Sequence, residues 1–273
     1  MIETLYFFEP LDALLIETLT NLDPHEWERP TVAKLWTVKD VAAHLLDGNL
    51  RALSIARDGY ASDAPGDVGS YDDLVSYLNR LNADWVQACK RLSPLVLIQL
   101  LKDSGHEYIN YLKSLNLYEK AVFSVAWAGE GESKNWMHMA REYTEKWLHQ
   151  QQIRKATNRP GILTGQFFRP LISTFMLGLP YALRNADARE GTILRVTIGS
   201  DVGGSWAVVR QEGSWRFTND TIHKLDAEVT VEPDIAWQLF SKSLRPADVH
   251  EGISVQGNAE LAQQALNMIS VMA

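Results

Sequence analysis

The stretch Arg141-Glu142-Tyr143-Thr144-Glu145-Lys146-Trp147-Leu148-His149 decides how the first half of this chain is interpreted. The sequence predicts one helix here, capped by Ser133 and continuing to about Lys155. Four residues span about one helical turn, so Glu145 and His149 fall on the same face. A carboxylate oxygen and an imidazole nitrogen can therefore converge on one point.

A second segment supplies the group that would complete this arrangement. Thr37 and Asp40 resemble a capping box and predict a helix from about Val38 to Arg57, which carries His44. Two imidazoles and one carboxylate are the protein ligands of an open metal site, in which a fourth position is left for water or substrate. Helical bundles place such ligands on facing helices around the core.

Plainer interpretations of the same residues remain open. A Glu-x-x-x-His pair on its own is by default a solvated acid–base contact, and Arg141, four residues before Glu145, is placed to occupy that carboxylate. His44 alone fits a hydrogen-bonded core imidazole equally well. Asp40 and Asp47 are either acceptors that orient the His44 ring or ordinary capping and surface acids.

The pattern of apolar residues changes after Asn158-Arg159-Pro160-Gly161, which ends the predicted helix. This segment marks the predicted boundary between two domains, residues 1–160 and 161–273. The first domain has the apolar spacing of a helical bundle, with a Gly- and Pro-containing loop at 59–69. The second begins with a helical stretch at 167–185 and then alternates in the manner of β-strands. The predicted strands are 193–198, 206–209, 215–217, 227–231 and 253–255, with helices at 233–242 and 258–271. The expected fold class is α+β, an all-α bundle followed by a small α+β domain with an antiparallel sheet.

Composition excludes several classes of function. The net charge is −8 without a basic patch, so neither nucleic acid nor an anionic lipid surface is an expected partner. No charge-free apolar run approaches the ~20 residues of a membrane span. Cys89 is the only cysteine, and the chain begins without a basic segment before an apolar stretch, so we expect a cytoplasmic protein.

Several motifs in order resemble a known family. They are Trp27 with Pro30-Thr31, the segment 36–44, Val125-Ala126-Trp127-Ala128-Gly129, and Arg141-x-x-x-Glu145-x-Trp147-x-His149 followed by Ile153 and Ala156. Together they resemble the mycothiol-dependent maleylpyruvate isomerase family, which belongs to the DinB-like metal-binding four-helix bundles. The resemblance covers residues 1–160. It implies that His44, Glu145 and His149 bind a divalent metal, usually zinc, and that a low-molecular-weight thiol is activated there.

The resemblance also extends to the C-terminal part and to a catalytic arginine. Members often carry a sterol-carrier-like domain, whose ending is similar to residues 244–261 here. In the isomerase an arginine from this domain is thought to reach the metal pocket. Arg245 is our prediction for that role, with Arg210 and Arg216 as rivals and a plain surface arginine as the alternative. The chain departs from the family's pattern after His149, where it reads Gln150-Gln151-Gln152-Ile153, and this puts the isomerase substrate in doubt.

Two further residues are candidates for the pocket. His138 lies seven residues before Glu145 on the same helix face, about 10 Å along the axis, which is too far to bind the same ion but suits the wall of a cleft. Trp127 is in a Gly-containing loop just before the metal helix.

Three functions are consistent with these residues. The first is a metal-dependent enzyme that activates a low-molecular-weight thiol for transfer or isomerisation of a small electrophilic substrate, and the second is metal-dependent hydrolysis without a thiol. The third is a non-enzymatic module that binds an apolar ligand or lipid and holds a structural metal. Two histidines and a carboxylate suit zinc, nickel, iron or manganese. The sequence leaves the metal, the thiol, the substrate and the oligomeric state open.

Overall fold

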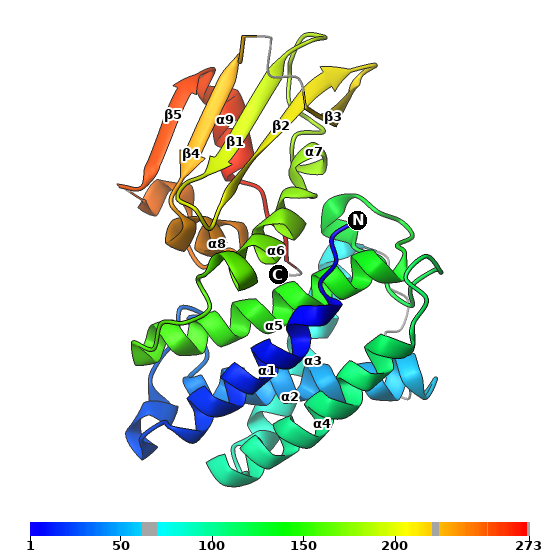
Figure 1. Ribbon diagram of the computed structural model, residues 1–273, viewed down its shortest axis with the longest axis vertical. Coiled ribbons are helices and arrows are strands. Elements are labelled where there is room, and N and C mark those ends of the chain that lie inside the picture. Colours follow the sequence, from blue (N-terminus) through cyan, green and yellow to red (C-terminus); the bar gives the residue numbers. More distant parts are fainter. Residues whose placement is uncertain (62–69, 220–223, 250, 272–273) are drawn as a thin grey trace.

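The computed structural model describes residues 1–61, 70–219, 224–249 and 251–271 (Figure 1). The helices of the first half are α1 (Leu5–Thr20), α2 (Val38–Ala52), α3 (Tyr71–Cys89), α4 (Pro94–Ser114) and α5 (Asn135–Thr157). Those of the second half are α6 (Gly165–Met176), α7 (Leu179–Ala182), α8 (Pro233–Phe240) and α9 (Ala259–Leu266). Short 3₁₀ or π turns are η1 (Pro24–Glu28), η2 (Leu53–Arg57), η3 (Ala126–Ala128) and η4 (Pro246–Asp248). The strands are β1 (Ile193–Ile198), β2 (Gly204–Gln211), β3 (Ser214–Thr218), β4 (Ala227–Val231) and β5 (Ile253–Gly257).

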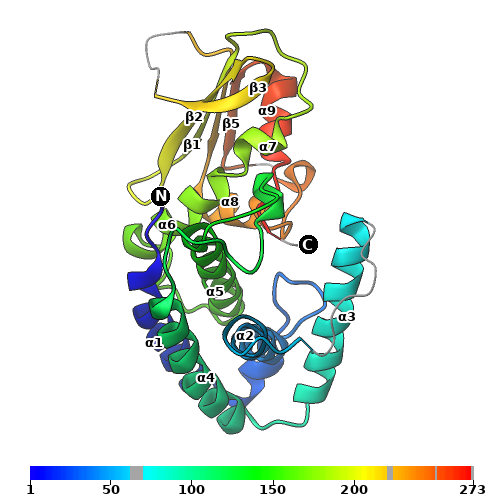
Figure 2. The same cartoon turned by 90° about the vertical axis from the view of Figure 1, so that its right-hand side faces the viewer.

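Four helices of the first half form a bundle. α4 packs between α1 and α2, and α5 contacts both of these helices from the other side, which closes the ring. Figure 2 shows α3 on the far side of α2 from α1. The bundle core includes Phe8, Leu11, Tyr108, Tyr143 and Trp147, all at most 1% exposed. Within the described residues no helix has the length and apolarity needed to cross a bilayer.

The ends of the two site-bearing helices follow their local sequence, with one exception. Thr37 Oγ1 accepts a hydrogen bond from the Asp40 amide and α2 starts at Val38, as predicted. α5 ends at Asn158, whose φ of 54° is the left-handed conformation that terminates helices. The predicted cap by Ser133 is wrong. Its hydroxyl accepts a hydrogen bond from the Val125 amide (2.8 Å) and donates to Glu130, so it fixes the preceding loop instead.

The five strands form one sheet in the order β3-β2-β1-β4-β5. β1, β2 and β3 pair as the predicted antiparallel meander, and β5 is antiparallel to β4. β4, however, lies parallel to β1, with Leu194 opposite Ala227 and Ile198 opposite Val231. The α+β class is confirmed, whereas the sheet is mixed and not purely antiparallel. Alternating apolar residues identify a strand but do not determine the direction of its partner.

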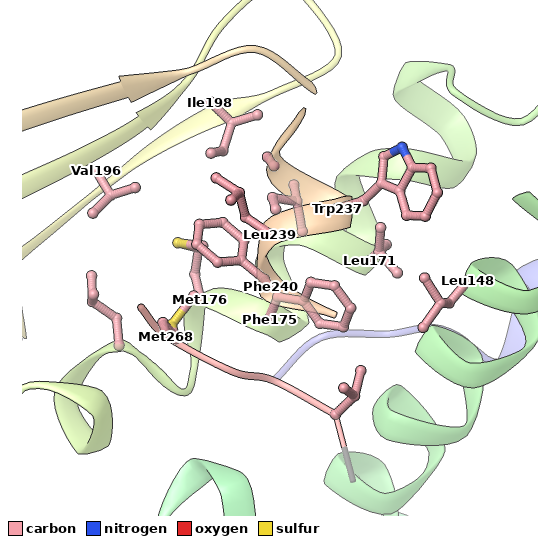
Figure 3. Packing of buried hydrophobic residues seen from close by; sticks show 14 of the residues in the cluster. Leu148, Leu171, Phe175, Met176, Val196, Ile198, Trp237, Leu239, Phe240 and Met268 are labelled. Carbon is pink, nitrogen blue, oxygen red and sulfur yellow. The ribbon is translucent and has the colours of Figure 1, made fainter. Parts of the chain in front are cut away.

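Apolar packing continues from the bundle into the second half of the chain. Trp147 of α5 meets Trp237 of α8 edge to face, with ring centroids 6.1 Å apart. Tyr143 donates a hydrogen bond to the Phe167 carbonyl oxygen at 2.7 Å. Figure 3 shows Leu148 of α5 beside the buried residues of α6 and α8, which include Leu171 and Trp237. The division at residue 160 stays a prediction, because one buried cluster spans it. The predicted loop at 59–69 falls largely on residues 62–69, outside the described residues.

Candidate metal centre

The predicted metal ligands meet where α2 and α5 pack together. One ligand atom from each of His44, Glu145 and His149 lies within 4.8 Å of the other two. His149 Nε2 is 3.4 Å from Glu145 Oε2, and the centroids of the two imidazole rings are 4.6 Å apart with the planes at 75°. His44, 101 positions before Glu145 in the sequence, therefore joins Glu145 and His149 in presenting two nitrogens and one oxygen to a common point.

A buried side chain fixes the ring of His149. His149 Nδ1 is 2.9 Å from the amide oxygen of Gln152, which is 4% exposed. The oxygen can only accept, so Nδ1 carries a proton, and in the neutral ring the Nε2 lone pair then faces Glu145. This contact was not predicted from the sequence. The signal was the spacing of three residues on one helix, which brings Gln152 beside His149.

The nitrogen chemistry of His44 suits a metal ligand. Its Nδ1 is buried and makes no hydrogen bond to any described residue. Burial holds the pKa of His44 well below its usual range, and the neighbouring His149 and Arg51 lower it further. The ring is therefore neutral at pH 7 and keeps a lone pair for an ion. Leaving such a nitrogen buried and unpaired costs free energy, so the donor set fits a bound cation.

Trp36 forms an aromatic wall beside the two imidazoles. Its ring centroid is 4.8 Å from that of His44 and 6.2 Å from that of His149. From the sequence, Trp36 is only part of a motif. A side chain just before a helix cap carries no signal of which ring it will contact, because the contact depends on how α5 packs against α2.

The acidic candidates beside His44 have other partners. Asp40 Oδ2 accepts hydrogen bonds from the Thr37 amide (3.0 Å) and hydroxyl (2.9 Å), so Asp40 belongs to the helix cap. Asp47 forms an ion pair with Arg51, with 3.0 Å between Oδ2 and Nε, and burial raises the pKa of Asp47. Neither carboxylate is bonded to His44 within the described part of the chain. For these two acids the structure favours the capping and ion-pair roles.

Arg141 does not neutralise Glu145. Its guanidinium donates to the adjacent Glu142 and, at 3.0 Å, to Nδ1 of His138. Glu142 also accepts a hydrogen bond from the Tyr108 hydroxyl at 2.8 Å. These residues form a buried polar cluster on α4 and α5, separate from the metal candidates. The objection that Arg141 would occupy the carboxylate of Glu145 is thereby removed.

The remaining candidates lie away from the trio of metal candidates. Trp127 lines a cavity of about 610 Å³ together with residues of α7, α9 and the C-terminal segment. The Arg245 side chain is 76% exposed and pairs with Asp248, with 2.9 Å between Nε and Oδ2. Arg216 pairs with Glu212, and Arg210 lines a second cavity of about 290 Å³. No contact among the described residues connects any of the three arginines to the trio.

The fold and the site define a class of protein, a helical bundle with a cluster of two histidines and one glutamate that is joined to a small α+β domain. The family model described as the mycothiol maleylpyruvate isomerase N-terminal domain matches residues 8–154, more than half of the chain. The chain belongs to this family.

Two solved structures agree with this fold. The chain is similar to the crystal structure of a mycothiol-dependent maleylpyruvate isomerase with a histidine-to-alanine substitution, with a TM-score of 0.56 and 10% identity over 92% of this chain and 91% of that chain. The structure of that isomerase without the substitution gives a TM-score of 0.52 and 9% identity over the same shares. A sterol carrier protein domain 2 of Helicoverpa armigera is 24% identical over 34% of this chain and 80% of that chain, with a TM-score of 0.28. The search among curated proteins found no match.

Proposed function

We propose that this protein is a metal-dependent enzyme of the maleylpyruvate isomerase type, in which His44, Glu145 and His149 hold a divalent cation. The single observation that carries the proposal is the convergence of their three ligand atoms within 4.8 Å. Membership of the family supports it independently. Three protein ligands leave a fourth position for an exchangeable group, which is the arrangement of catalytic sites, whereas structural zinc sites are usually closed by four protein ligands.

Each residue of the trio has a distinct task in this proposal. Glu145 supplies the negative charge, while His44 and His149 supply neutral nitrogens. When bound, the cation would deprotonate a coordinated thiol, or draw the pKa of a coordinated water toward ~7. Trp36 shields the two imidazoles on one side, which limits the access of water to the ligand atoms. The two buried helices hold these groups in place before substrate arrives.

The finer assignment is a low-molecular-weight thiol as co-substrate and a small electrophilic molecule as substrate, with isomerisation or transfer as the reaction and zinc as the first choice of metal. Nickel, iron and manganese remain alternatives for the same donor set. We further propose a cytoplasmic location, supported by Cys89, a free and buried cysteine.

Metal analysis tests the core of the proposal. Protein purified without added metal should contain about one divalent ion per chain, and His149→Ala should lose it because one of three ligands is removed. His138→Gln is the matched control, since His138 is a second buried histidine on α5 that is not part of the trio. Both variants should be checked for folding by circular dichroism. A stoichiometry near zero in the wild type, unchanged by His149→Ala, would refute metal binding.

An assay with the thiol omitted separates the two enzymatic reactions. Turnover of a reactive electrophile should require an added low-molecular-weight thiol if the fourth position takes a thiolate. Turnover at the same rate without thiol would assign the protein to metal-dependent hydrolysis instead.

A binding module with a structural metal is the less favoured function. It would show co-purified lipid in native mass spectrometry and no exchangeable water on the metal. The open arrangement of three ligands argues against it.

A further inference from the structure

We propose that Gln152 is the positioning residue of the metal centre, a neutral amide that locks His149 in the tautomer whose Nε2 is free to bind a cation. The inference rests on the proposed function only in taking His149 as a ligand. Its own observation is the buried contact of 2.9 Å between Gln152 Oε1 and His149 Nδ1.

For a neutral His149 ring, the chemistry of the contact leaves one arrangement of protons. A neutral imidazole carries one N–H, and an amide oxygen can only accept. With the oxygen facing Nδ1, the proton resides there and Nε2 keeps its lone pair toward Glu145, 3.4 Å away. If the amide nitrogen faced the ring instead, Nδ1 would have to accept and Nε2 would carry the proton, which would block it as a ligand. The orientation of one amide therefore decides whether His149 can bind a metal.

Burial makes this selection strong. Gln152 is 4% exposed and His149 is 9% exposed, so bulk water competes poorly for either partner. Both residues lie on α5 at a spacing of three, so the helix holds the amide against the ring without a flexible loop. A hydrogen bond in such surroundings is electrostatically stronger than it would be in water.

The neutrality of the amide has a consequence for the fourth ligand. Metal-bound histidines often donate to a carboxylate, which adds a negative charge beside the ion. Here Gln152 adds none, Asp40 is a helix cap and Asp47 is paired with Arg51. A divalent ion with Glu145 as its charged ligand would keep a net charge of about +1. Such a site accepts a further anion, and a thiolate is an anion of this kind.

The test uses Gln152→Leu, which removes the acceptor, and Gln152→Glu, which restores it with a charged oxygen. Gln151→Leu is the matched control, because Gln151 is the adjacent buried glutamine and its side-chain oxygen has no partner among the described residues. Two quantities are measured on each full-length variant: the tautomer of His149 in metal-free protein by ¹⁵N-edited NMR, and the affinity for Zn²⁺ by competition with a chromophoric chelator.

We expect Gln152→Leu to populate the form with the proton on Nε2 and to weaken Zn²⁺ binding by about 10- to 100-fold. Gln152→Glu should restore the wild-type tautomer and affinity, and Gln151→Leu should change neither. The proposal is overturned if Gln152→Leu keeps the wild-type tautomer, whatever its affinity. If Gln152→Leu fails to fold, Gln152→Met supplies a side chain of similar length without the amide oxygen.

The outcomes also separate this inference from the proposed function. A wild type that binds no Zn²⁺ but shows the tautomer shift in Gln152→Leu would refute metal binding and retain the positioning role. If the wild type binds Zn²⁺ but Gln152→Leu keeps the wild-type tautomer, metal binding is retained and the positioning role of Gln152 is refuted.

Discussion

Burial sets the charge of His138, which shares α5 with His149. His138 lies on α5 between Arg141 and the Phe123 ring, and the residue is 6% exposed. Burial lowers the pKa of His138 to about 4; Glu142 opposes this shift and Arg141 adds to it. The ring is therefore neutral at physiological pH, and its Nδ1 accepts a hydrogen bond from Arg141.

This low pKa predicts how stability depends on pH. Between pH 4 and about 6.5 the unfolded chain binds a proton at His138 that the folded chain does not, so stability falls as the pH falls through this window. A shift from 6.5 to about 4 amounts to roughly 3 kcal/mol at the acidic end. His138→Gln should remove this part of the pH dependence. Urea unfolding of metal-free protein at pH 7, 5.5 and 4.5 measures it, and equal slopes in wild type and variant would contradict the assignment.

At the residue scale, spacing within one helix was predictable and contacts between helices were not. The turn that brings Glu145 to His149 follows from 3.6 residues per turn. Arg141 pairs with Glu142 and not with Glu145, and Glu142 also accepts a hydrogen bond from the hydroxyl of Tyr108, which comes from another helix. Trp36 was missed for the same reason, because its neighbour His149 lies 113 positions further along the chain.

At the scale of helices, one glycine of α4 leaves room for a carboxylate of α1. A Cβ built on Gly105 would lie 2.5 Å from Asp12 Oδ2. That carboxylate is the partner of the buried Lys146, with 3.2 Å between Nζ and Oδ1. The position of that carboxylate, and with it the ion pair to α5, therefore depends on the absence of a side chain at Gly105.

Gly105→Ala should destabilise the protein by about 1–3 kcal/mol, since Asp12 must move away from Lys146 or the helices must separate. Gly48→Ala is the control in α2, where an added Cβ meets nothing within 4 Å. That substitution should stabilise by about 0.5–1 kcal/mol, because alanine restricts the unfolded chain and favours helix. Chemical denaturation of both variants checks the opposite signs, and a common sign would refute the role of Gly105.

The start of α2 supports a third prediction. Thr37→Ala removes the hydroxyl that accepts from the Asp40 amide and donates to its carboxylate at 2.9 Å. We expect a loss of about 0.5–2 kcal/mol in the free energy of unfolding. Thr37→Ser, which keeps the hydroxyl, should lose much less. Equal losses in the two variants would mean that the cap contributes nothing.

The elements themselves were largely readable from the sequence. The capping box at Thr37, the end of α5 at Asn158 and the meander of β1, β2 and β3 all follow local patterns. The parallel placement of β4 beside β1 does not, because it pairs segments that are about 30 residues apart and no local pattern records the direction of that pairing. The failed cap at Ser133 has a related cause, since a loop amide from Val125 competes for its hydroxyl.

At the scale of the whole molecule, the bundle and the sheet share one packed interior. Trp237 of α8 is fully buried against Trp147, and its indole nitrogen donates to Asp234 at 3.0 Å. Asp234 also pairs with Lys155 near the end of α5, with 2.7 Å between Oδ2 and Nζ. Packing and charge thus connect the helix that carries Glu145 and His149 to the second half of the chain.

This connection predicts that the two halves unfold together. Trp237→Ala should cost about 3–5 kcal/mol, and hydrogen exchange should speed up by similar factors in peptides from α4 and from β1, because both depend on the same interior. Phe217→Ala is the control on β3, where the ring is 43% exposed, and should leave both sets of peptides nearly unchanged. Mass spectrometry of exchange under native conditions reads both regions in one experiment. Faster exchange confined to the strand peptides would mean that residues 1–160 form an independent folding unit, so the proposed metal site would be stable without the sheet.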